Sequence, residues 1–413
     1  MKRILSLMLC ILLCLPCAVS RAEGELTVVH ATDIHFLSPG LTDYGDYFMF
    51  IIESADGKVT HYTPQLMQAF VEDMLHLNPD AVILTGDLTL NGAPQSHAEL
   101  AALLMPLVDA GIPVFALPGN HDCGAPAYRF DGEDVAAIEG TADEEIDNLY
   151  AVFGYDRAIS RDASSMSYIT AISPDVWCLM LDVNANGTAG TINKETFAWI
   201  REQLSLAQQA GVTVISATHQ PLLTHNRLFT IGYSVSNGSQ LLMTYEEYGV
   251  PLNLCGHLHM QHIVQTDSFV EIAASSLAVS PNQYGVLRFE NGQPVDYAMR
   301  QTDVSGWAER SGQSDPNLLD FPAYSAAFFD DTTIRQTSSM YPAGVSAQEQ
   351  QMMTDFAVTL NAQYFSGRRT LTMDDPAWAL WEKHMPGSFF AYYMRSILED
   401  PLSDMSHYDF IKE

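Results

Sequence analysis

Positive charge is scarce in this sequence. Its 413 residues include 19 Lys and Arg against 50 Asp and Glu, which gives a formal net charge of −31 at pH 7. A surface of this sign repels phosphate backbones, so we do not expect a nucleic-acid partner. A phosphate-containing substrate would need a local cation to hold it.

Apolar runs long enough to cross a membrane are also missing. The run near the N-terminus, Ile4–Leu15, has 12 residues, follows Lys2-Arg3 and precedes small residues that end at Ala22. A bilayer span needs about 20 apolar residues, whereas this pattern is typical of a signal peptide. We therefore predict a signal peptide over 1–22 and a secreted or extracytoplasmic protein without stable membrane insertion. Retention of the segment as a cell-surface anchor is the alternative.

Cysteine pairs that could staple the fold are not apparent. Three of the six cysteines lie in the predicted signal peptide, and Cys123, Cys178 and Cys255 lie singly inside apolar runs. Small exported domains usually depend on disulfides. With 47% hydrophobic and 10% aromatic residues, however, this chain can build a sizeable core. We expect the fold to depend on that core or on metal.

Apolar β-branched runs alternate with helical patterns between residues 26 and 300. The alternation predicts an α/β domain built in layers. The expected strands are Leu26–Ala31, Ala81–Thr85, Pro113–Leu117, Val176–Leu181, Val212–Ala217 and Leu252–Cys255, and the expected helices include Thr63–Leu77, Ser96–Ala110 and Glu195–Ala210.

Two turn sequences, Asp56-Gly57 and Asn291-Gly292, predict hairpins. The flanking runs are Phe48–Ile52 and Lys58–Tyr62 for the first turn, and Tyr284–Glu290 and Pro294–Arg300 for the second.

The character of the sequence changes near residue 301. Ala, Gln, Met and aromatic residues then recur at helical spacing, as in Ala347–Phe365 and Trp378–His384. We predict an α/β domain over 23–300 and a smaller all-α domain over 301–413. The aromatic residues expected in the core of the second domain, or on a lid or dimer face, are Phe328, Phe329, Trp378, Trp381, Phe389, Phe390, Tyr392 and Tyr393.

Side chains that bind metals follow the predicted strands. Loops after strand ends converge on one edge of an open α/β sheet. In an extended chain, side chains two residues apart point to the same side. Asp33 and His35 would then face one ion together, and so would His257 and His259. Carboxylate, imidazole and amide groups without thiolate favour Mn, Fe or Zn. The residues concerned are Asp33, His35, Asp87, Asn120, His121, His219, His257 and His259.

These residues form blocks in a distinctive order. The blocks Asp33-x-His35, Gly86-Asp87, Gly119-Asn120-His121-Asp122, His219 and Gly256-His257-x-His259 resemble those of the calcineurin-like metallophosphoesterase superfamily over about residues 26 to 300. The resemblance implies an α/β fold with a layered β-sandwich flanked by helices. The 23–300 domain would then be the catalytic one.

The resemblance also implies two divalent or trivalent metal ions. Asp33, His35 and His259 would hold one ion, Asn120, His219 and His257 would hold the other, and Asp87 would bridge them. A hydroxide that bridges the two ions would attack phosphorus. His121 matches the catalytic histidine of the family and would act as general acid toward the leaving oxygen.

The residues after Asp87 narrow the resemblance. Gly86–Gly92 lacks the G-D-x-x-D-R-G block of protein Ser/Thr phosphatases and the tyrosine of purple acid phosphatases. Leu90 stands where several branches place an acidic partner of the catalytic histidine, so such a dyad is left open. His30–Pro39 and the helical C-terminal region instead resemble exported bacterial class III cyclic-nucleotide phosphodiesterases. We therefore expect a secreted phosphodiesterase that acts on cyclic nucleotides or similar small phosphodiesters.

Other functions stay open at this stage, because such a site recognises phosphate and little else. A phosphomonoesterase or a hydrolase of cell-envelope phosphodiesters is the alternative among enzymes. A non-catalytic surface protein that binds through the same fold is the alternative outside them, although the complete ligand set argues against it. The sequence leaves the oligomeric state undetermined.

Some nearby residues have simpler explanations. The insertion between Asp33 and Asp87 leaves room for the predicted Phe48–Tyr62 hairpin to close over the metals as a lid. His61 and Tyr62 on its return strand could reach substrate or lie on a solvated edge. His30, inside a strand, is expected to be a core residue, whereas His225 and His262 could line the cleft or be ordinary loop histidines.

Overall fold

A computed structural model describes residues 24–184 and 190–410 of this protein. The predicted signal peptide lies outside the described residues and stays a prediction. Within the described ranges, no helix combines the length and the apolar character that a bilayer span requires.

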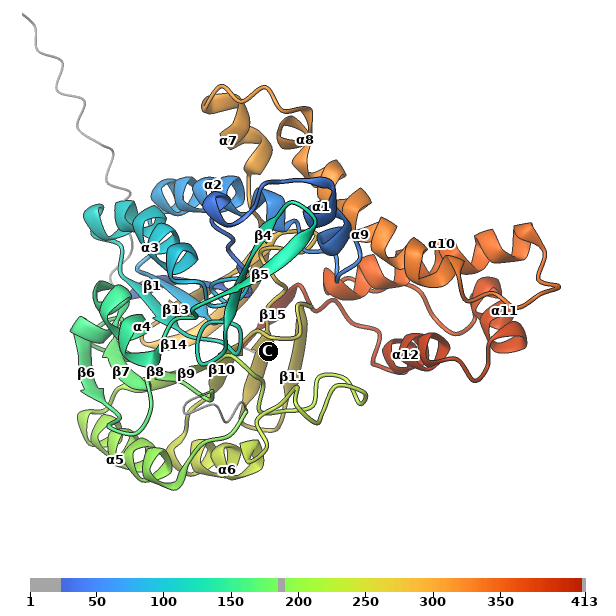
Figure 1. Ribbon diagram of the computed structural model, residues 1–413. Coiled ribbons are helices and arrows are strands. Elements are labelled where there is room, and N and C mark those ends of the chain that lie inside the picture. The colour runs from blue at the N-terminus through green and yellow to red at the C-terminus, as the bar shows by residue number, and fades with distance from the viewer. Residues whose placement is uncertain (1–23, 185–189, 411–413) are drawn as a thin grey trace, which may run out of the picture.

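Two β-sheets form the centre of the molecule (Figure 1). Val28, Leu84, Cys178 and Ile215 belong to one hydrophobic cluster although they come from different sheets, so the sheets pack face to face. This arrangement confirms the predicted layered β-sandwich. The six-stranded sheet has the order β15 (His407–Asp409), β14 (Gln293–Gln301), β13 (Gln283–Glu290), β1 (Glu25–Ala31), β2 (Ala81–Thr85) and β3 (Val114–Leu117). The seven-stranded sheet has the order β11 (His262–Gln265), β12 (Val270–Ala273), β10 (Leu252–Cys255), β9 (Thr213–Thr218), β8 (Val176–Leu181), β7 (Tyr168–Ala171) and β6 (Ala158–Arg161).

Helices cover the outer faces of both sheets (Figure 1). Phe70 of α2 (Thr63–Leu77) and Leu104 of α3 (Pro94–Asp109) pack against the first sheet. Ile200 of α5 (Lys194–Ala210) and Leu241 of α6 (Gly238–Tyr248) pack against the second. A separate ribbon is formed by β4 (Ala127–Asp131) and β5 (Asp134–Ile138). The helices are α1 (Asp46–Glu53), α2 (Thr63–Leu77), α3 (Pro94–Asp109), α4 (Asp143–Leu149), α5 (Lys194–Ala210), α6 (Gly238–Tyr248), α7 (Val304–Arg310), α8 (Pro316–Leu319), α9 (Phe321–Ser338), α10 (Ala347–Phe365), α11 (Pro376–His384) and α12 (Phe389–Leu398). Short 3-10 turns are η1 (Pro39–Leu41), η2 (Thr60–Tyr62), η3 (Ala151–Phe153) and η4 (Tyr155–Arg157).

The strands that lead to the predicted ligands are parallel to one another within each sheet, although β1 is antiparallel to its other neighbour, β13. β1 is parallel to β2 and β2 to β3, while β8, β9, β10 and β12 are parallel in the second sheet. All five residues of β2 are buried, as expected for a parallel strand covered on both faces. The six strands predicted from apolar runs are confirmed, and parallel pairing places their carboxyl ends at one edge.

The predicted hairpin over Phe48–Tyr62 is wrong. Its first half belongs to helix α1, and its second half contains η2. Phe48 and Ile52, one helical turn apart, are buried against Leu41 and Phe130. A run of consecutive apolar residues fits the period of a helix as well as that of a strand, and here contacts with η1 and β4 favour the helix.

The C-terminal region is helical from α7 to α12 and projects to one side of the sandwich (Figure 1). Trp378, Trp381 and Phe390 are buried in its own core cluster, as predicted. Phe389 and Tyr392 of α12 are 71% and 51% exposed, so they lie outside this core, and the alternative of a lid or dimer face stays a prediction. After the helices, β15 pairs antiparallel with β14, so the chain returns to the sheet edge.

Candidate metal centre

The predicted ligands lie in loops at the carboxyl ends of β1, β2, β3, β9 and β10. Backbone hydrogen bonds hold two of these loops together, from Asp33 N to Gly86 O (3.1 Å) and from His35 N to Asp87 O (2.9 Å). Five of the seven ligands have a left-handed backbone, which residues other than glycine rarely adopt and which concentrates at functional sites. Their φ values are 52° for Asp33, 46° for His35, 47° for Asp87, 68° for His257 and 59° for His259.

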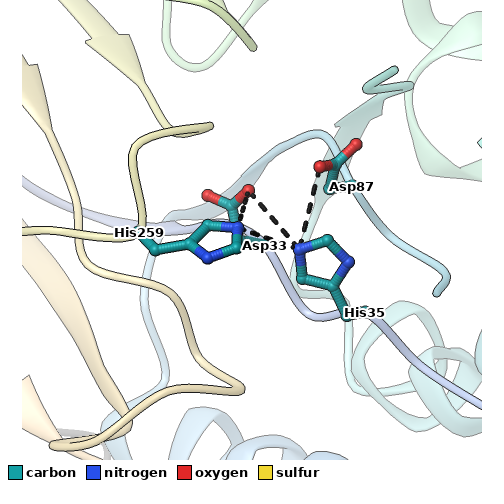
Figure 2. A group of neighbouring side chains, drawn as sticks. All are labelled: Asp33, His35, Asp87 and His259. Carbon is teal, nitrogen blue, oxygen red and sulfur yellow. Dashed lines mark hydrogen bonds and ion pairs between the residues drawn. The ribbon is translucent and has the colours of Figure 1, made fainter. Parts of the chain in front are cut away.

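Asp33, His35, Asp87 and His259 form the first group of donors (Figure 2). His35 Nε2 lies 3.0 Å from His259 Nε2 and 3.7 Å from Asp87 Oδ2. His259 Nε2 lies 3.4 Å from Asp33 Oδ1. The resemblance assigned these residues to one ion, and the structure brings them together.

Asp87, His219 and His257 form the second group. His219 Nε2 lies 3.2 Å from Asp87 Oδ2, 3.3 Å from His257 Nδ1 and 3.1 Å from Asn120 Oδ1. Asp87 Oδ2 therefore faces both groups, as expected for a bridging carboxylate.

Hydrogen bonds from the far side of two rings orient them toward this centre. His219 Nδ1 donates to Thr85 O at 2.8 Å, and His257 Nε2 donates to Gly232 O at 3.3 Å, which leaves the other nitrogen of each ring toward Asp87. Burial lowers the pKa of His219, but Asp87 outweighs this effect and raises it to about 9. Burial and the charge of His219 lower the pKa of His257 to about 4. Asp87 thus favours positive charge at the ring of His219.

The donor atoms fit metal ions. Asp33 Oδ1 is buried and accepts no hydrogen bond, although its carboxylate faces His259. The Nε2 atoms of His35 and His259 point at each other, and at most one proton can lie between them. A cation accepts lone pairs from all of these atoms at once. Oxygen and imidazole ligands of this kind suit Mn, Fe or Zn.

Glycine is required where the loops approach each other most closely. A Cβ atom at Gly119 would collide with Asp87 Oδ1 and the Asp87 backbone. A Cβ atom at Gly256 would collide with the side chains of Thr32 and Asp33. The glycines in the sequence blocks therefore let the ligand loops pack against one another.

His121 lies at the open side of the centre, with 41% of its side chain exposed. Its Nδ1 donates to Leu90 O at 2.9 Å, and its Nε2 lies 3.9 Å from Asp87 Oδ2. The partner of His121 is thus a backbone carbonyl and not an acidic side chain. This carbonyl belongs to Leu90, the position at which several branches of the family place the acidic partner.

Asp122 has a structural role. Its buried carboxylate accepts hydrogen bonds from the backbone N–H groups of Leu88 (3.0 Å), Thr89 (2.8 Å) and Gly119 (2.7 Å). These donors come from the two loops that carry Asp87 and Asn120. Asp122 therefore fixes the positions of the Asp87 loop and the Asn120 loop relative to each other.

Two residues of the predicted lid contact the C-terminal region. His61 Nε2 lies 2.6 Å from the Tyr324 hydroxyl, and the Tyr62 hydroxyl donates to Asp315 at 2.7 Å. The proposal that either reaches substrate from a hairpin is not supported, because both side chains are engaged by the segments around α8 and α9.

Three of the other histidines, His30, His225 and His262, are buried outside the two donor groups. His30 Nε2 lies 3.0 Å from the Thr85 hydroxyl, as expected for a core residue. His225 and His262 pack against each other with 3.2 Å between their Nδ1 atoms, and His225 also contacts Glu271. They belong to a second polar cluster under the C-terminal region.

Three residues near the centre, Asp56, Lys58 and Gln220, were not predicted from the sequence. Asp56 Oδ2 lies 3.6 Å from His259 Nδ1 and accepts a 2.7 Å hydrogen bond from Lys58, whose side chain is 12% exposed. Gln220 donates to Asn184 (2.8 Å) and to Asn120 Oδ1 (3.4 Å). The sequence indicates Asp56 only as a turn residue, and nothing in the local pattern around Lys58 and Gln220 indicates these contacts.

A family model covers most of the α/β region. Residues 26–261 match calcineurin-like phosphoesterase. The chain belongs to the calcineurin-like phosphoesterase family. The two donor groups are candidate sites for the divalent metals of this family. Residues 303–404 match the C-terminal domain of cyclic nucleotide phosphodiesterase.

Relatives of this calcineurin-like phosphoesterase carry phosphodiesterase names. A probable cyclic nucleotide phosphodiesterase of Rhodococcus erythropolis is 27% identical over 56% of this chain and 64% of that protein. A cAMP/cGMP dual specificity phosphodiesterase of Mycobacterium tuberculosis is 22% identical over 59% of this chain and 64% of that protein. A probable glycerophosphodiester phosphodiesterase of Arcobacter nitrofigilis is 23% identical over 64% of this chain and 90% of that protein. The matched segment thus spans less than two thirds of the first two relatives.

The fold has a counterpart among solved structures. A dimetal phosphatase from Danio rerio aligns with a TM-score of 0.50 at 12% sequence identity, over 68% of this chain and 96% of that chain. At this identity the likeness concerns the fold alone, which agrees with the β-sandwich described above.

Proposed function

We propose that this protein is an exported dimetal phosphodiesterase that hydrolyses cyclic nucleotides or similar small phosphodiesters. The observation that carries the proposal is the position of Asp87 in both donor groups, with His121 beside them. When bound, two such ions attract the phosphate group and acidify a water molecule that serves as nucleophile. One ion would be held by Asp33, His35 and His259 and the other by Asn120, His219 and His257, with Asp87 shared.

His121 would protonate the leaving oxygen. Because its Nδ1 donates to Leu90 O, Nε2 is the nitrogen left to exchange a proton with substrate. The backbone N–H of His121 donates to Asp87 Oδ1 at 2.9 Å, which fixes the position of the acid relative to the shared carboxylate. Exposure of the ring gives substrate access to it.

The relatives support phosphodiesters and suggest two substrate types. The Rhodococcus and Mycobacterium proteins, and the match of residues 303–404, favour cyclic nucleotides. The Arcobacter relative favours glycerophosphodiesters as the second candidate, and its match covers more of both chains. Both substrates place the same phosphodiester over the metals, so the difference must arise in the groups around them.

Metal analysis and a substrate panel on one purified preparation test this function. Chelation should abolish hydrolysis, and Mn²⁺, Fe²⁺ or Zn²⁺ should restore it. Asp87→Ala should lose turnover and most of one metal, whereas Asp109→Ala, which removes an exposed carboxylate on α3, should lose neither. Two metals and an unchanged rate in Asp87→Ala would refute the site. Faster hydrolysis of glycerophosphodiesters or of monoesters than of cyclic nucleotides would show that cyclic nucleotides are not the preferred substrate.

Export is the second part of the proposal and rests on the sequence of residues 1–22. Sequencing of the N-terminus of the protein recovered from its own cells should begin close to Glu23. An intact Met1 in a cytoplasmic fraction would contradict export without affecting the catalytic assignment.

A further inference from the structure

A cavity of about 240 Å³ lies directly beside the metal centre. His257 and His259 form part of its wall, so a group bound in it would be next to a phosphate held at the ligands. Pockets that enclose a whole drug-sized ligand are usually ~300–1,000 Å³. This cavity therefore suits one ring system rather than a complete substrate.

The loop between β9 and α6 supplies aromatic rings to the cavity. Phe229 and Tyr233 pack with 5.0 Å between ring centroids, and Tyr233 lies 5.8 Å from the ring of His257. The carbonyl of Gly232 accepts the hydrogen bond from His257 Nε2, which ties this loop to a ligand of the metal centre. Tyr233 is nevertheless 42% exposed, so its ring is accessible to a ligand.

The C-terminal region supplies the facing wall, from α10 and α12. Tyr393 lies 6.0 Å from the ring of Phe229. Tyr364 is buried, and its hydroxyl accepts a 3.0 Å hydrogen bond from Asn226 Nδ2, which joins this wall to the loop that carries Phe229. The carboxylate of Asp56 stands at the rim and is 48% exposed. The cavity thus combines aromatic walls with a carboxylate at its rim.

We propose that this cavity binds the heteroaromatic base of a nucleoside phosphodiester by stacking on Tyr233 and Phe229. The inference rests on the proposed function and names the substrate class: a nucleoside cyclic phosphate rather than a glycerophosphodiester. Every nucleic-acid base can stack on an aromatic side chain, and base N–H groups can donate to a carboxylate such as Asp56. A glycerol or ethanolamine group has no ring and would leave these walls unused.

The first experiment compares two substrates that share the reacting bond. One is 3′,5′-cyclic AMP, and the other is 1-O-methylribose 3′,5′-cyclic phosphate, which lacks the base. In the wild type, kcat/KM should be higher for cyclic AMP. Tyr233→Ala and Phe229→Ala should each lower the ratio of the two kcat/KM values by about tenfold to a hundredfold. Tyr233→Phe keeps the ring and should keep the ratio, and so should Phe50→Ala, which removes an exposed aromatic ring on α1.

The second experiment measures binding without catalysis. Adenosine, which carries no phosphate, should bind the wild-type protein saturably in calorimetry, ribose should not, and Tyr233→Ala should weaken adenosine binding by the same factor. Absence of adenosine binding, or an unchanged substrate ratio in both alanine variants, would overturn the base site. Adenosine binding without hydrolysis of either cyclic phosphate would instead overturn the proposed function and leave the base site intact.

Discussion

Replacement of His121 by alanine tests the general-acid role proposed for this residue. The ring has one partner on each side: its Nδ1 donates to Leu90 O, and its Nε2 faces the centre near Asp87. The backbone N–H that bonds Asp87 Oδ1 is kept in the variant. His121→Ala should therefore retain the metals and lose the proton donor.

The expected magnitudes differ sharply between rate and stability. Loss of a general acid typically lowers the rate by 10²- to 10⁴-fold, which corresponds to about 2.7–5.4 kcal/mol in the activation free energy. The free energy of unfolding should change by only about 1 kcal/mol, because the ring is 41% exposed and gives up one hydrogen bond. A variant that unfolds would therefore contradict the geometry described here.

The assay compares substrates that differ in their need for a proton. With 3′,5′-cyclic AMP, whose leaving alkoxide is strongly basic, the full loss is expected. With bis-p-nitrophenyl phosphate, whose leaving group hardly needs protonation, the loss should be much smaller. His76→Ala, which removes an exposed histidine on α2, is the matched control. An equal loss on both substrates would refute the general-acid role, and loss of metal would show that His121 acts as a ligand.

Two further predictions concern the framework of the centre, and a third concerns a carboxyl group on α2. Asp122→Ala should lower the free energy of unfolding by ~3–5 kcal/mol and reduce metal content, because three buried N–H groups lose their acceptor. Asp122→Asn keeps one acceptor oxygen and should lose less stability. Equal losses of stability in denaturant titrations of the two variants would count against this role. Gly119→Ala should keep its circular dichroism spectrum but bind little metal, because the new Cβ would displace Asp87; full metal occupancy would contradict the close approach. Burial raises the pKa of Asp73 to about 6, so the folded protein should lose stability as the pH rises from about 4, near the unfolded value, through 6. Asp73→Asn, which keeps an acceptor for the Asp303 N–H, should thus raise the melting temperature at pH 7 and change it little near pH 4, and an equal change at both pH values would argue against this origin.

The sequence was most informative where burial is uniform. β2 and β10 are buried at every position, so their apolar runs could be recognised without knowing the fold. The positions of Asp87 and His257 after those strands then predicted one edge for all ligands. The alternation of an extended strand did not predict how the side chains converge, however. Asp33 and His35 converge through left-handed turns and not through the alternation of an extended strand.

Contacts between distant segments could not be predicted. The helix at Phe48–Ile52 depends on packing against Phe130, more than 75 residues away in the sequence. The partner of His121 is the carbonyl of Leu90, and every residue has a carbonyl, so no residue type could indicate it. Asp56 reaches His259 only because the turn after α1 lies beside the metal centre.

The two-ended attachment of the C-terminal region has a consequence for how the protein can be dissected. At its start, Arg310 pairs with Glu72 of α2, and at its end β15 extends the sheet at β14. A chain cut after β14 would lose the walls supplied by Tyr364 and Tyr393, and it would also leave β14 as an unpaired edge open to aggregation. Both ends of the C-terminal region are thus attached to the sandwich. Point substitutions in α10 and α12, and not truncation, are the way to separate substrate recognition from folding.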